Sequence, residues 1–264
     1  MSLAPHILVA HPLDGADVGE RTALPEGALH HLRRVLRLAD GARLSLTDGR
    51  GVLADATLQG HDAVLAAAAV VTPEPQPRIV LAQALSKGRR AEDAVRVACE
   101  LGVDRIVPVV AARTQGRPDA RAAEALVARW RGVAVAALEQ SRGARLAEVA
   151  APADRVVAAV PAQDGVLRLL AAPGGEPLPS LHPIAGGSGS DLAEVVVAVG
   201  PEGGWTPEEV AAASADGWLP VGLGPTVLRT EHAGPVAVAV VAALLGRWDA
   251  ATLEPRPSRS PDAL

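Results

Sequence analysis

The segment Val195–Glu209, VVVAVGPEGGWTPEE, decides the fold. The apolar residues before Gly200 have the pattern of a buried strand. Three of the five residues that begin at Gly200 are glycine, so the backbone there can take positive φ and pass close to a ligand. Thr206, Pro207 and Glu209 then have the pattern of a helix start, as N-cap, first helical residue and capping-box partner. Because ligands of open α/β sheets bind at the carboxyl ends of strands, this turn is predicted to be a binding edge. Taken alone, the segment is equally compatible with a simple tight turn.

A second strand end strengthens the prediction. Leu219–Leu223 is a predicted strand, and Gly224-Pro225-Thr226-Val227-Leu228-Arg229-Thr230-Glu231 follows it. We expect the two glycine-bearing strand ends, some twenty residues apart, to line one pocket from adjacent strands. Arg229 and Glu231 add opposite charges beside this pocket, although a surface pair at a helix start contributes little to stability. His232 is expected to be a solvated or capping residue.

The remaining pattern divides the chain in two. Residues 1–72 are predicted to form a small β-barrel of short strands with one helix, Glu26–Arg37; the strands are Ile7–Ala10, Arg43–Thr47, Gly51–Leu58 and Ala63–Val71. Residues 73–77 contain three prolines and are predicted to be a stiff linker.

Residues 78–248 alternate between strands and helices, which predicts a parallel α/β sheet. The further expected strands are Ile79–Ala84, Asp104–Val110 and Val156–Val160, and the expected helices are Ala91–Leu101, Ala120–Gln140, Asp164–Leu170, one from Pro207 and Pro235–Trp248. Pro173–Ser190 is expected to be a loop, and residues 249–264 are predicted to be a disordered tail.

Composition excludes several classes of protein. The chain has 264 residues and one cysteine, Cys99, so no intramolecular disulfide is possible and a reducing cytoplasm fits. No Cys or His pairs have zinc-ligand spacing, no apolar run is long enough for a transmembrane helix, and the N-terminus lacks a signal-peptide pattern. Phe and Tyr are absent, which excludes RNA modules that stack bases on those side chains.

Charge is unevenly distributed along the chain. The formal net charge is −5, but residues 78–145 carry +6 between segments of −3 and −8. A basic segment between acidic ones is a candidate polyanion footprint, although arginines scattered over solvated helix faces give the same count. Lys87 is the only lysine in the chain.

Taken in order, these motifs resemble those of one family. GPEGG followed by LGPTVLRTE resembles the C-terminal motifs of the RsmE-type ribosomal RNA methyltransferases of the SPOUT superfamily. The segments that match its other motifs are Leu32–Arg37, Ser86-Lys87-Gly88, Glu100-Leu101-Gly102-Val103, Trp130 and Glu139-Gln140-Ser141. The resemblance covers about residues 5–248.

The resemblance implies a fold and an activity. The fold would be a trefoil-knotted parallel-sheet methyltransferase domain, residues 78–248, preceded by a PUA-like β-barrel that binds RNA, residues 1–72. The activity would be methylation of uracil N3 of a uridine in small-subunit (16S) ribosomal RNA, by a cytoplasmic homodimer that uses S-adenosyl-L-methionine and no metal.

The resemblance also assigns residues. Those that would bind the methyl donor are Gly200, Pro201, Glu202, Gly203, Leu223, Gly224 and Leu228. Methyl transfer to N3 needs a carboxylate that accepts the N3 proton and a cation that stabilises the developing charge, so the catalytic candidates are Glu202 or Glu231 as base and Arg229 as the cation. Glu202 could equally only organise its loop. The planar guanidinium of arginine suits phosphate, and the RNA-binding candidates are Arg33, Arg34, Arg37, Lys87, Arg89, Arg90 and Arg142.

Two other functions stay open at this stage. A related SPOUT enzyme would methylate a ribose 2′-hydroxyl, and a non-catalytic RNA-binding or ribosome assembly factor would keep the fold without the donor. A nucleotide-dependent oxidoreductase is disfavoured because the dinucleotide fingerprint is missing.

Overall fold

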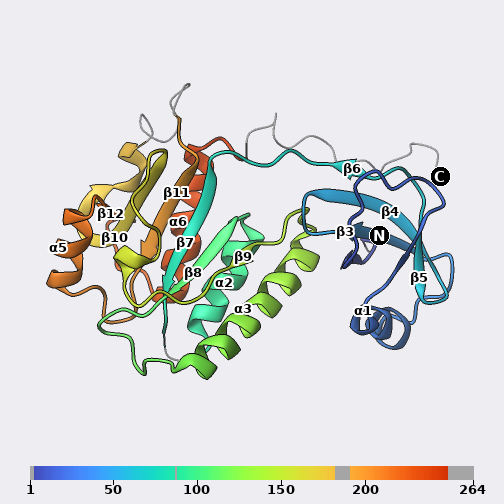
Figure 1. Ribbon diagram of the computed structural model, residues 1–264, viewed down its shortest axis with the longest axis horizontal. Helices are drawn as coiled ribbons and strands as arrows, with labels where there is room; N and C mark the ends of the chain where they lie inside the picture. The colour runs from blue at the N-terminus through green and yellow to red at the C-terminus, as the bar shows by residue number, and fades with distance from the viewer. Residues whose placement is uncertain (1–2, 87, 182–190, 249–264) are drawn as a thin grey trace. The chain divides into compact units, whose positions relative to one another are not determined.

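The computed structural model describes residues 3–86, 88–181 and 191–248 and divides the chain into two compact units (Figure 1). Residues 3–74 and 138–146 belong to the first unit, and the other described residues belong to the second. The change of unit after Glu74 falls inside the proline-rich segment 73–77. Lys87, the end of the expected loop Pro173–Ser190 and the expected tail lie outside the described residues. Within the described ranges, the structure contains no helix that combines the length and apolarity needed to cross a membrane.

The first unit is a six-stranded sheet with its own core. Its strand order is β1-β3-β4-β5-β2, and β6 pairs with β4; the bounds are β1 His6–Leu8, β2 Arg21–Ala23, β3 Arg43–Thr47, β4 Val52–Gln59, β5 Asp62–Leu65 and β6 Val70–Val71. Side chains of β4 alternate between buried and partly exposed, as expected for a strand with one face on a core. The core includes Ile7, Leu32, Leu44 and Leu58.

Three details of this unit differ from the sequence prediction. The expected strand Ala63–Val71 is interrupted and forms both β5 and β6. The expected helix Glu26–Arg37 is a short helix α1, Glu26–His30, followed by a π-helical turn, His31–Val35. Strand β2 has no counterpart in the prediction, because three residues with one buried side chain give too short a pattern to detect.

A segment far along the chain completes the first unit. Glu139 accepts a hydrogen bond at Oε1 from the Leu8 amide at 3.1 Å, and His6 Nε2 donates to the Gly143 carbonyl at 2.9 Å. Arg145 donates from its two Nη atoms to the carbonyls of Arg50 and Thr72, each at 2.6 Å. The segment 138–146 is therefore part of the fold of this unit, which a boundary at the proline-rich linker alone does not predict.

The second unit is a six-stranded, wholly parallel sheet, as the sequence predicts. Its order is β12-β10-β11-β7-β8-β9, and the strands are β7 Arg78–Ala84, β8 Arg105–Val109, β9 Glu148–Val149, β10 Val166–Pro177, β11 Glu194–Val199 and β12 Leu219–Gly222. Its helices are α2 Arg90–Glu100, α3 Ala120–Ser141, α5 Pro207–Ala215 and α6 Thr230–Leu244; α3 ends in the first unit. Helix α6 starts five residues before the predicted Pro235, which lies inside it.

Two predicted elements in this unit are wrong. The expected strand Val156–Val160 is a 3₁₀ turn, Val156–Ala158, that packs against α5. The expected helix Asp164–Leu170 is instead the start of β10, which continues through Pro177 into the expected loop. A short apolar run fits a buried strand and a buried helix equally well, and only its pairing with β11 and β12 decides between them.

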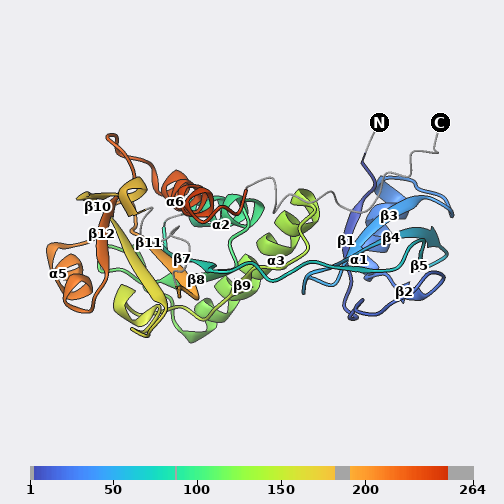
Figure 2. The ribbon, with the colours of Figure 1, turned by 90° about the horizontal axis from the view of Figure 1, so that it is seen from above.

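The two faces of the sheet carry different helices, with α2 and α6 on one face and α5 on the other (Figure 2). Along β7, Val80, Ala82 and Ala84 belong to the core that includes the α5 face, and the alternate residues Leu81 and Gln83 lie against Gly234 of α6. This alternation follows from the two-residue period of a strand.

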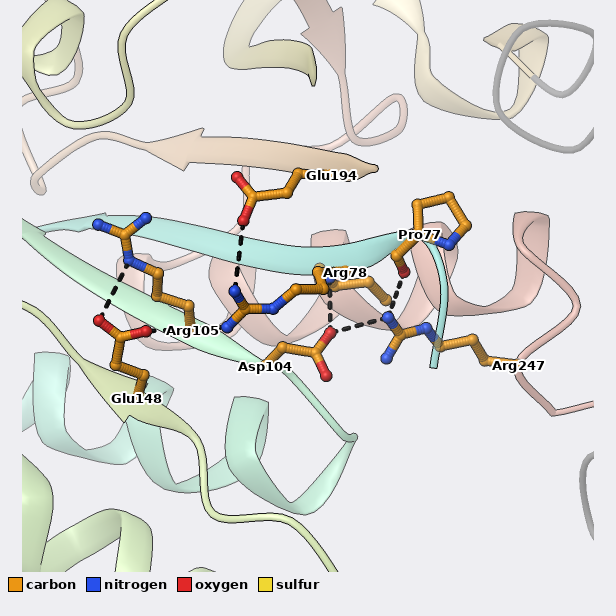
Figure 3. A network of polar contacts seen from close by, with 8 residues as sticks. Pro77, Arg78, Asp104, Arg105, Glu148, Glu194 and Arg247 are labelled. Atoms are coloured by element: carbon orange, nitrogen blue, oxygen red, sulfur yellow. Dashed lines mark hydrogen bonds and ion pairs between the residues drawn. The ribbon is translucent and has the colours of Figure 1, made fainter. Parts of the chain in front are cut away.

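The amino-terminal edge of the sheet is held by charge pairs (Figure 3). The first residues of four strands form these pairs: Arg78 with Glu194 at 3.6 Å and with Glu148 at 3.7 Å, and Arg105 with Glu148 at 3.7 Å. Arg247, just after α6, pairs with Asp104 at 2.7 Å and donates to the Pro77 carbonyl. The charged side chains at this edge therefore bind one another, whereas the glycine loops lie at the opposite, carboxyl edge.

Candidate functional site

The loop Gly200–Trp205 leaves the carboxyl end of β11 and lies on a tryptophan. Trp205 is buried in the core beneath it, and its Nε1 donates to the Ala171 carbonyl of β10 at 3.1 Å. A Cβ on Gly200 would be 3.3 Å from the Trp205 ring, so glycine lets the chain pass over the indole. The predicted helix start is confirmed: Thr206 Oγ1 accepts from the Glu209 amide, Glu209 Oε2 accepts from the Thr206 amide, and Pro207 begins α5.

Loops from neighbouring strands hold this loop in place. Arg90, at the start of α2 after β7, pairs with Glu202 at 3.1 Å. Arg113, in the loop after β8, donates to the Gly203 carbonyl at 2.5 Å. Glu209 also accepts from the Ala112 amide through Oε1 at 2.8 Å. The carboxyl ends of β7, β8 and β11 are thus connected by specific contacts, which the sequence analysis did not predict for Arg113.

The loop Leu223–Arg229 follows β12, but β12 is not adjacent to β11. The expectation that the two glycine-bearing strand ends are neighbours is wrong, because β10 lies between them. Since strands in a sheet are about 4.8 Å apart, the two strand ends are separated by roughly 10 Å. The end of β10, around Ala171–Pro177, therefore belongs to the floor of the site, and it was missed because its strand was predicted as helix and loop.

The floor between the two loops is shaped by close backbone packing. A Cβ on Gly175 of β10 would lie 2.5 Å from the Val221 amide nitrogen of β12, so only glycine fits there. The pairing of β10 with β12 shifts register between Ala171 and Glu176. Gly203 and Gly224 are both exposed, and Gly224 has φ of 135° with open space around it. The site therefore offers exposed backbone at both sides of an approximately 10 Å gap, an arrangement that suits recognition of a small ligand by main-chain groups.

The charged candidates lie on both sides of this gap. Arg229 is the N-cap residue of α6 and its side chain is 82% exposed. Glu231, in the first turn of α6, is 19% exposed and lies 4.0 Å from Arg229. An acidic side chain in the first turn interacts favourably with the helix dipole. Glu202 is engaged with Arg90 on the β11 side.

The RNA-binding candidates of the first unit differ in their surroundings. Arg33 donates to the carbonyls of Leu38 and Gly60 and pairs with Asp40. The hydrogen bond from the Arg33 guanidinium to Asp40 lowers the pKa of the Asp40 carboxyl. Arg142 has φ of 61° and donates to the Ala4 carbonyl. Both side chains therefore have structural partners, whereas Arg34 and Arg37 are exposed.

In the second unit, Arg89 and Arg90 are exposed beside the site. The side chain of Arg89 is 89% exposed and lies 3.8 Å from Glu92, whereas Arg90 contacts Glu202. Lys87 lies outside the described residues.

Comparison with known proteins identifies the family. The model of an RNA methyltransferase domain matches residues 72–242, and that of an RNA methyltransferase PUA domain matches residues 24–66. The chain is 35% identical over 229 residues to ribosomal RNA small subunit methyltransferase E of Mycobacterium tuberculosis, covering 83% of this chain and 85% of the relative. The chain belongs to the ribosomal RNA small subunit methyltransferase E family. A relative of the same name from Synechocystis is 34% identical, over 84% of this chain and 73% of the relative.

Solved structures of this kind share the fold. The methyltransferase E of Neisseria gonorrhoeae, solved with S-adenosyl methionine, aligns with a TM-score of 0.77 at 29% identity over 92% of this chain and 98% of its own. A putative methyltransferase from Legionella pneumophila, solved with the same cofactor, aligns with a TM-score of 0.75 at 27% identity and the same coverages. The resemblance found in the sequence is thereby confirmed, as are the PUA-like first unit and the methyltransferase domain.

Proposed function

We propose that this protein transfers a methyl group from S-adenosyl-L-methionine to N3 of a specific uracil in small-subunit (16S) ribosomal RNA. The observation that carries the proposal is the pair of glycine-containing loops, Gly200–Gly204 and Leu223–Arg229, on either side of the end of β10 in a chain of this family. Homologues from Neisseria gonorrhoeae and Legionella pneumophila bind the methyl donor, which supports the same donor here.

The residues of the two loops fit such a donor. Exposed backbone at Gly203 and Gly224, with the partly buried Leu223 and Leu228, offers polar main-chain groups and apolar side chains in one place. When bound, the donor supplies a methyl group on a sulfonium that already contains its leaving group. The protein then has to align the acceptor and handle one proton and the developing charge.

Arg229 and Glu231 are the residues we assign to these two tasks. The exposed side chain of Arg229 is accessible to a uracil oxygen or an RNA phosphate, and its guanidinium would stabilise negative charge there. Glu231 is our candidate for the group that accepts the N3 proton, because Glu202 is engaged with Arg90 and so supports the loop.

The test is in vitro methylation of small ribosomal subunits and of free 16S RNA with labelled donor, followed by mass spectrometry of the digested RNA. We expect 3-methyluridine at one position. Methylation at a ribose 2′-oxygen would replace the proposal with the related 2′-O activity, and absence of donor binding in calorimetry would favour a non-catalytic assembly factor.

Variants separate binding from chemistry. Arg229→Ala and Glu231→Gln should keep the donor Kd within about twofold while lowering kcat by roughly 10²-fold or more. Arg43→Ala is the matched control, because Arg43 is exposed on β3 of the first unit, whereas both loops belong to the second unit. Full activity in Arg229→Ala would remove Arg229 from the mechanism.

We further propose that the protein acts in the cytoplasm as a homodimer, that its second unit contains a trefoil knot, and that it needs no metal. Light scattering measures the mass in solution, and activity after dialysis against EDTA tests the last point. A monomeric mass for a fully active preparation, or loss of activity on dialysis that Mg²⁺ restores, would contradict the corresponding part.

A further inference from the structure

A cleft of ≈ 370 Å³ lies in the second unit between the start of α2 and the first half of α3. We call it the α2–α3 cleft. Three segments line it: the loop after β7, the loop after β8, and one face of α3 that includes Ala122, Ala125, Leu126 and Arg129. These α3 positions are spaced three or four residues apart, so they form a continuous helical stripe. The volume is within the ~300–1,000 Å³ typical of small-ligand sites.

The walls of the α2–α3 cleft combine apolar and polar groups. Ala91, Ala122, Ala125 and Leu126 provide apolar surface, and Gln115, Glu92 and Arg129 provide polar groups. Ser86 Oγ and Trp130 Nε1, from two lining side chains, are buried and have no hydrogen-bond partner among the described residues. Trp130 as a whole is fully buried. Hydrogen-bonding groups beside apolar side chains suit a flat heterocycle, which has polar edges and apolar faces. A phosphate would need uncompensated positive charge, whereas Arg129 in this lining is paired with Glu92.

The position of the cleft relates it to the two glycine loops. Arg90 directly precedes Ala91 of the cleft and pairs with Glu202, and Arg113, two residues before Gln115, contacts Gly203. The cleft therefore opens at the carboxyl edge of the sheet, on the β7–β8 side of the Gly200–Gly204 loop. Counting strands at about 4.8 Å each, it lies roughly 10–15 Å from the end of β10. At that separation it cannot hold the same base as the methyl-transfer site.

Arginines surround the mouth of the cleft. Arg89, Arg117 and Arg121 are all exposed on the segments that border it. Exposed guanidinium groups around a cleft with both polar and apolar lining match a single nucleic-acid strand, with phosphates on the rim and an unstacked base inside.

We propose that the α2–α3 cleft binds an unstacked nucleobase that flanks the methylated uridine in the same RNA strand. The proposal rests on the proposed function for the identity of the strand. It assigns Ser86, Gln115 and Arg129 to recognition of that base, and the arginines at the rim to its phosphates. RNA is bound in this way by many single-strand readers, which insert splayed bases into pockets.

The cleft can be filled without disturbing the core. Ala122 and Ala125 are both exposed and both line the cleft, so the double variant Ala122→Leu/Ala125→Leu adds bulk inside it on a helix that tolerates leucine. Ala128→Leu is the matched control, because Ala128 is exposed on the same helix and does not line the cleft. Circular dichroism melting of the three proteins should give the same midpoint within about 2 °C, since all three positions are exposed.

The measurement is binding of a 16S RNA transcript and of S-adenosyl-L-methionine to the full-length variants, together with steady-state methylation of the small subunit. We expect the filled-cleft variant to weaken RNA binding by roughly 10-fold or more, to raise KM for RNA similarly and to leave the donor Kd unchanged. The control should match the wild type. Equal RNA affinity and equal KM in the filled-cleft variant and the control would overturn the proposal.

Failure of the cleft and failure of the proposed function give different results. A wild type that methylates RNA, with a filled-cleft variant that is indistinguishable from it, refutes the cleft alone. A wild type that methylates neither substrate, but binds the transcript more tightly than the filled-cleft variant does, refutes the proposed activity and supports the cleft.

Discussion

Two helical glycines in the second unit should respond in opposite directions to the same substitution. Gly132 lies within α3, is exposed, and has no atom within 4 Å of the position of a Cβ. Gly234 lies within α6, and a Cβ there would be 2.6 Å from Gln83 Oε1 and 3.2 Å from Leu81 Cδ2. Gly132→Ala is therefore expected to stabilise the unit, and Gly234→Ala to destabilise it.

The expected magnitudes follow from two opposing contributions. Alanine in a helix interior is favoured over glycine by about 1 kcal/mol, and this gain applies to both positions. At Gly234 the new methyl group would approach Gln83 to about 1 Å less than the ~3.5 Å of normal contact. Gln83 is fully buried, so its amide has no solvent into which to rotate, and overpacking of this kind costs roughly 1–3 kcal/mol. With a cost near 2 kcal/mol, Gly234→Ala is net destabilising by about 1 kcal/mol, and the two variants should differ by about 2 kcal/mol, or roughly 4–8 °C in Tm.

Scanning calorimetry of both variants, following the transition of the second unit, provides the assay. A double-mutant cycle with Gln83→Ala identifies the cause, because removing the amide should relieve the contact and give a coupling of about 1–2 kcal/mol. If Gly234→Ala raises Tm as much as Gly132→Ala does, the close packing of α6 on Gln83 is refuted. Zero coupling in the cycle would place the strain elsewhere, for example at Leu81.

Three further predictions concern single residues. Burial raises the pKa of the Cys99 thiol to about 12, so its reaction with Ellman's reagent at pH 8 should be about 10³-fold slower in the folded protein than for a thiol with the ordinary pKa of 9.0; a rate equal to that of the unfolded chain would contradict this. Arg145→Met removes two hydrogen bonds to main-chain carbonyls and should lower the stability of the first unit by about 2–3 kcal/mol. The control Arg43→Met, at an exposed position of β3, should change this stability little. Equal melting temperatures of the two variants would show that the Arg145 contacts contribute no net stability. The hydrogen bond from Arg33 lowers the pKa of Asp40 below its ordinary value of 3.8, so the stabilisation is present above about pH 4 and is lost as pH falls through the lowered pKa; the Tm gap between wild type and Asp40→Asn should therefore close at low pH, and a constant gap would exclude this linkage.

The sequence was most informative where local and long-range requirements agree. The run Val195–Glu209 contains a buried strand, a glycine turn and a capping box in succession, and each is present in the structure. It was least informative where tertiary pairing decides. Val166–Leu170 has no periodicity that separates a strand from a helix, and it became a central strand because β11 and β12 offer it partners on both sides.

The same limit explains what was missed at the site. The adjacency of β11 and β12 cannot be read from two similar loop motifs, because the strand that separates them comes earlier in the chain. Arg113 and Arg145 look like other arginines of the basic segment, and their roles depend on the carbonyls they reach, at Gly203 in one case and at Arg50 and Thr72 in the other. Sequence pattern finds the residues of a motif, but it does not find partners that are distant in the chain.

The arginines of this chain show why a positive charge count is a weak guide to RNA binding. Arg78, Arg105 and Arg247 serve the amino-terminal edge of the sheet, and Arg33, Arg142 and Arg145 serve carbonyls of the first unit. Such contacts use the several donors of the guanidinium group to satisfy carboxylate and backbone acceptors, which a lysine could not do in the same geometry. Arg89, Arg117 and Arg121 remain exposed and border the α2–α3 cleft, and Arg229 is exposed in the loop after β12. The excess of +6 in residues 78–145 is thus informative about RNA only after the structural arginines are set aside. Of those that are left, Arg89, Arg90 and Arg117 lie in or just after the loops at the carboxyl edge of the sheet, the same edge as the glycine loops where methyl transfer is proposed.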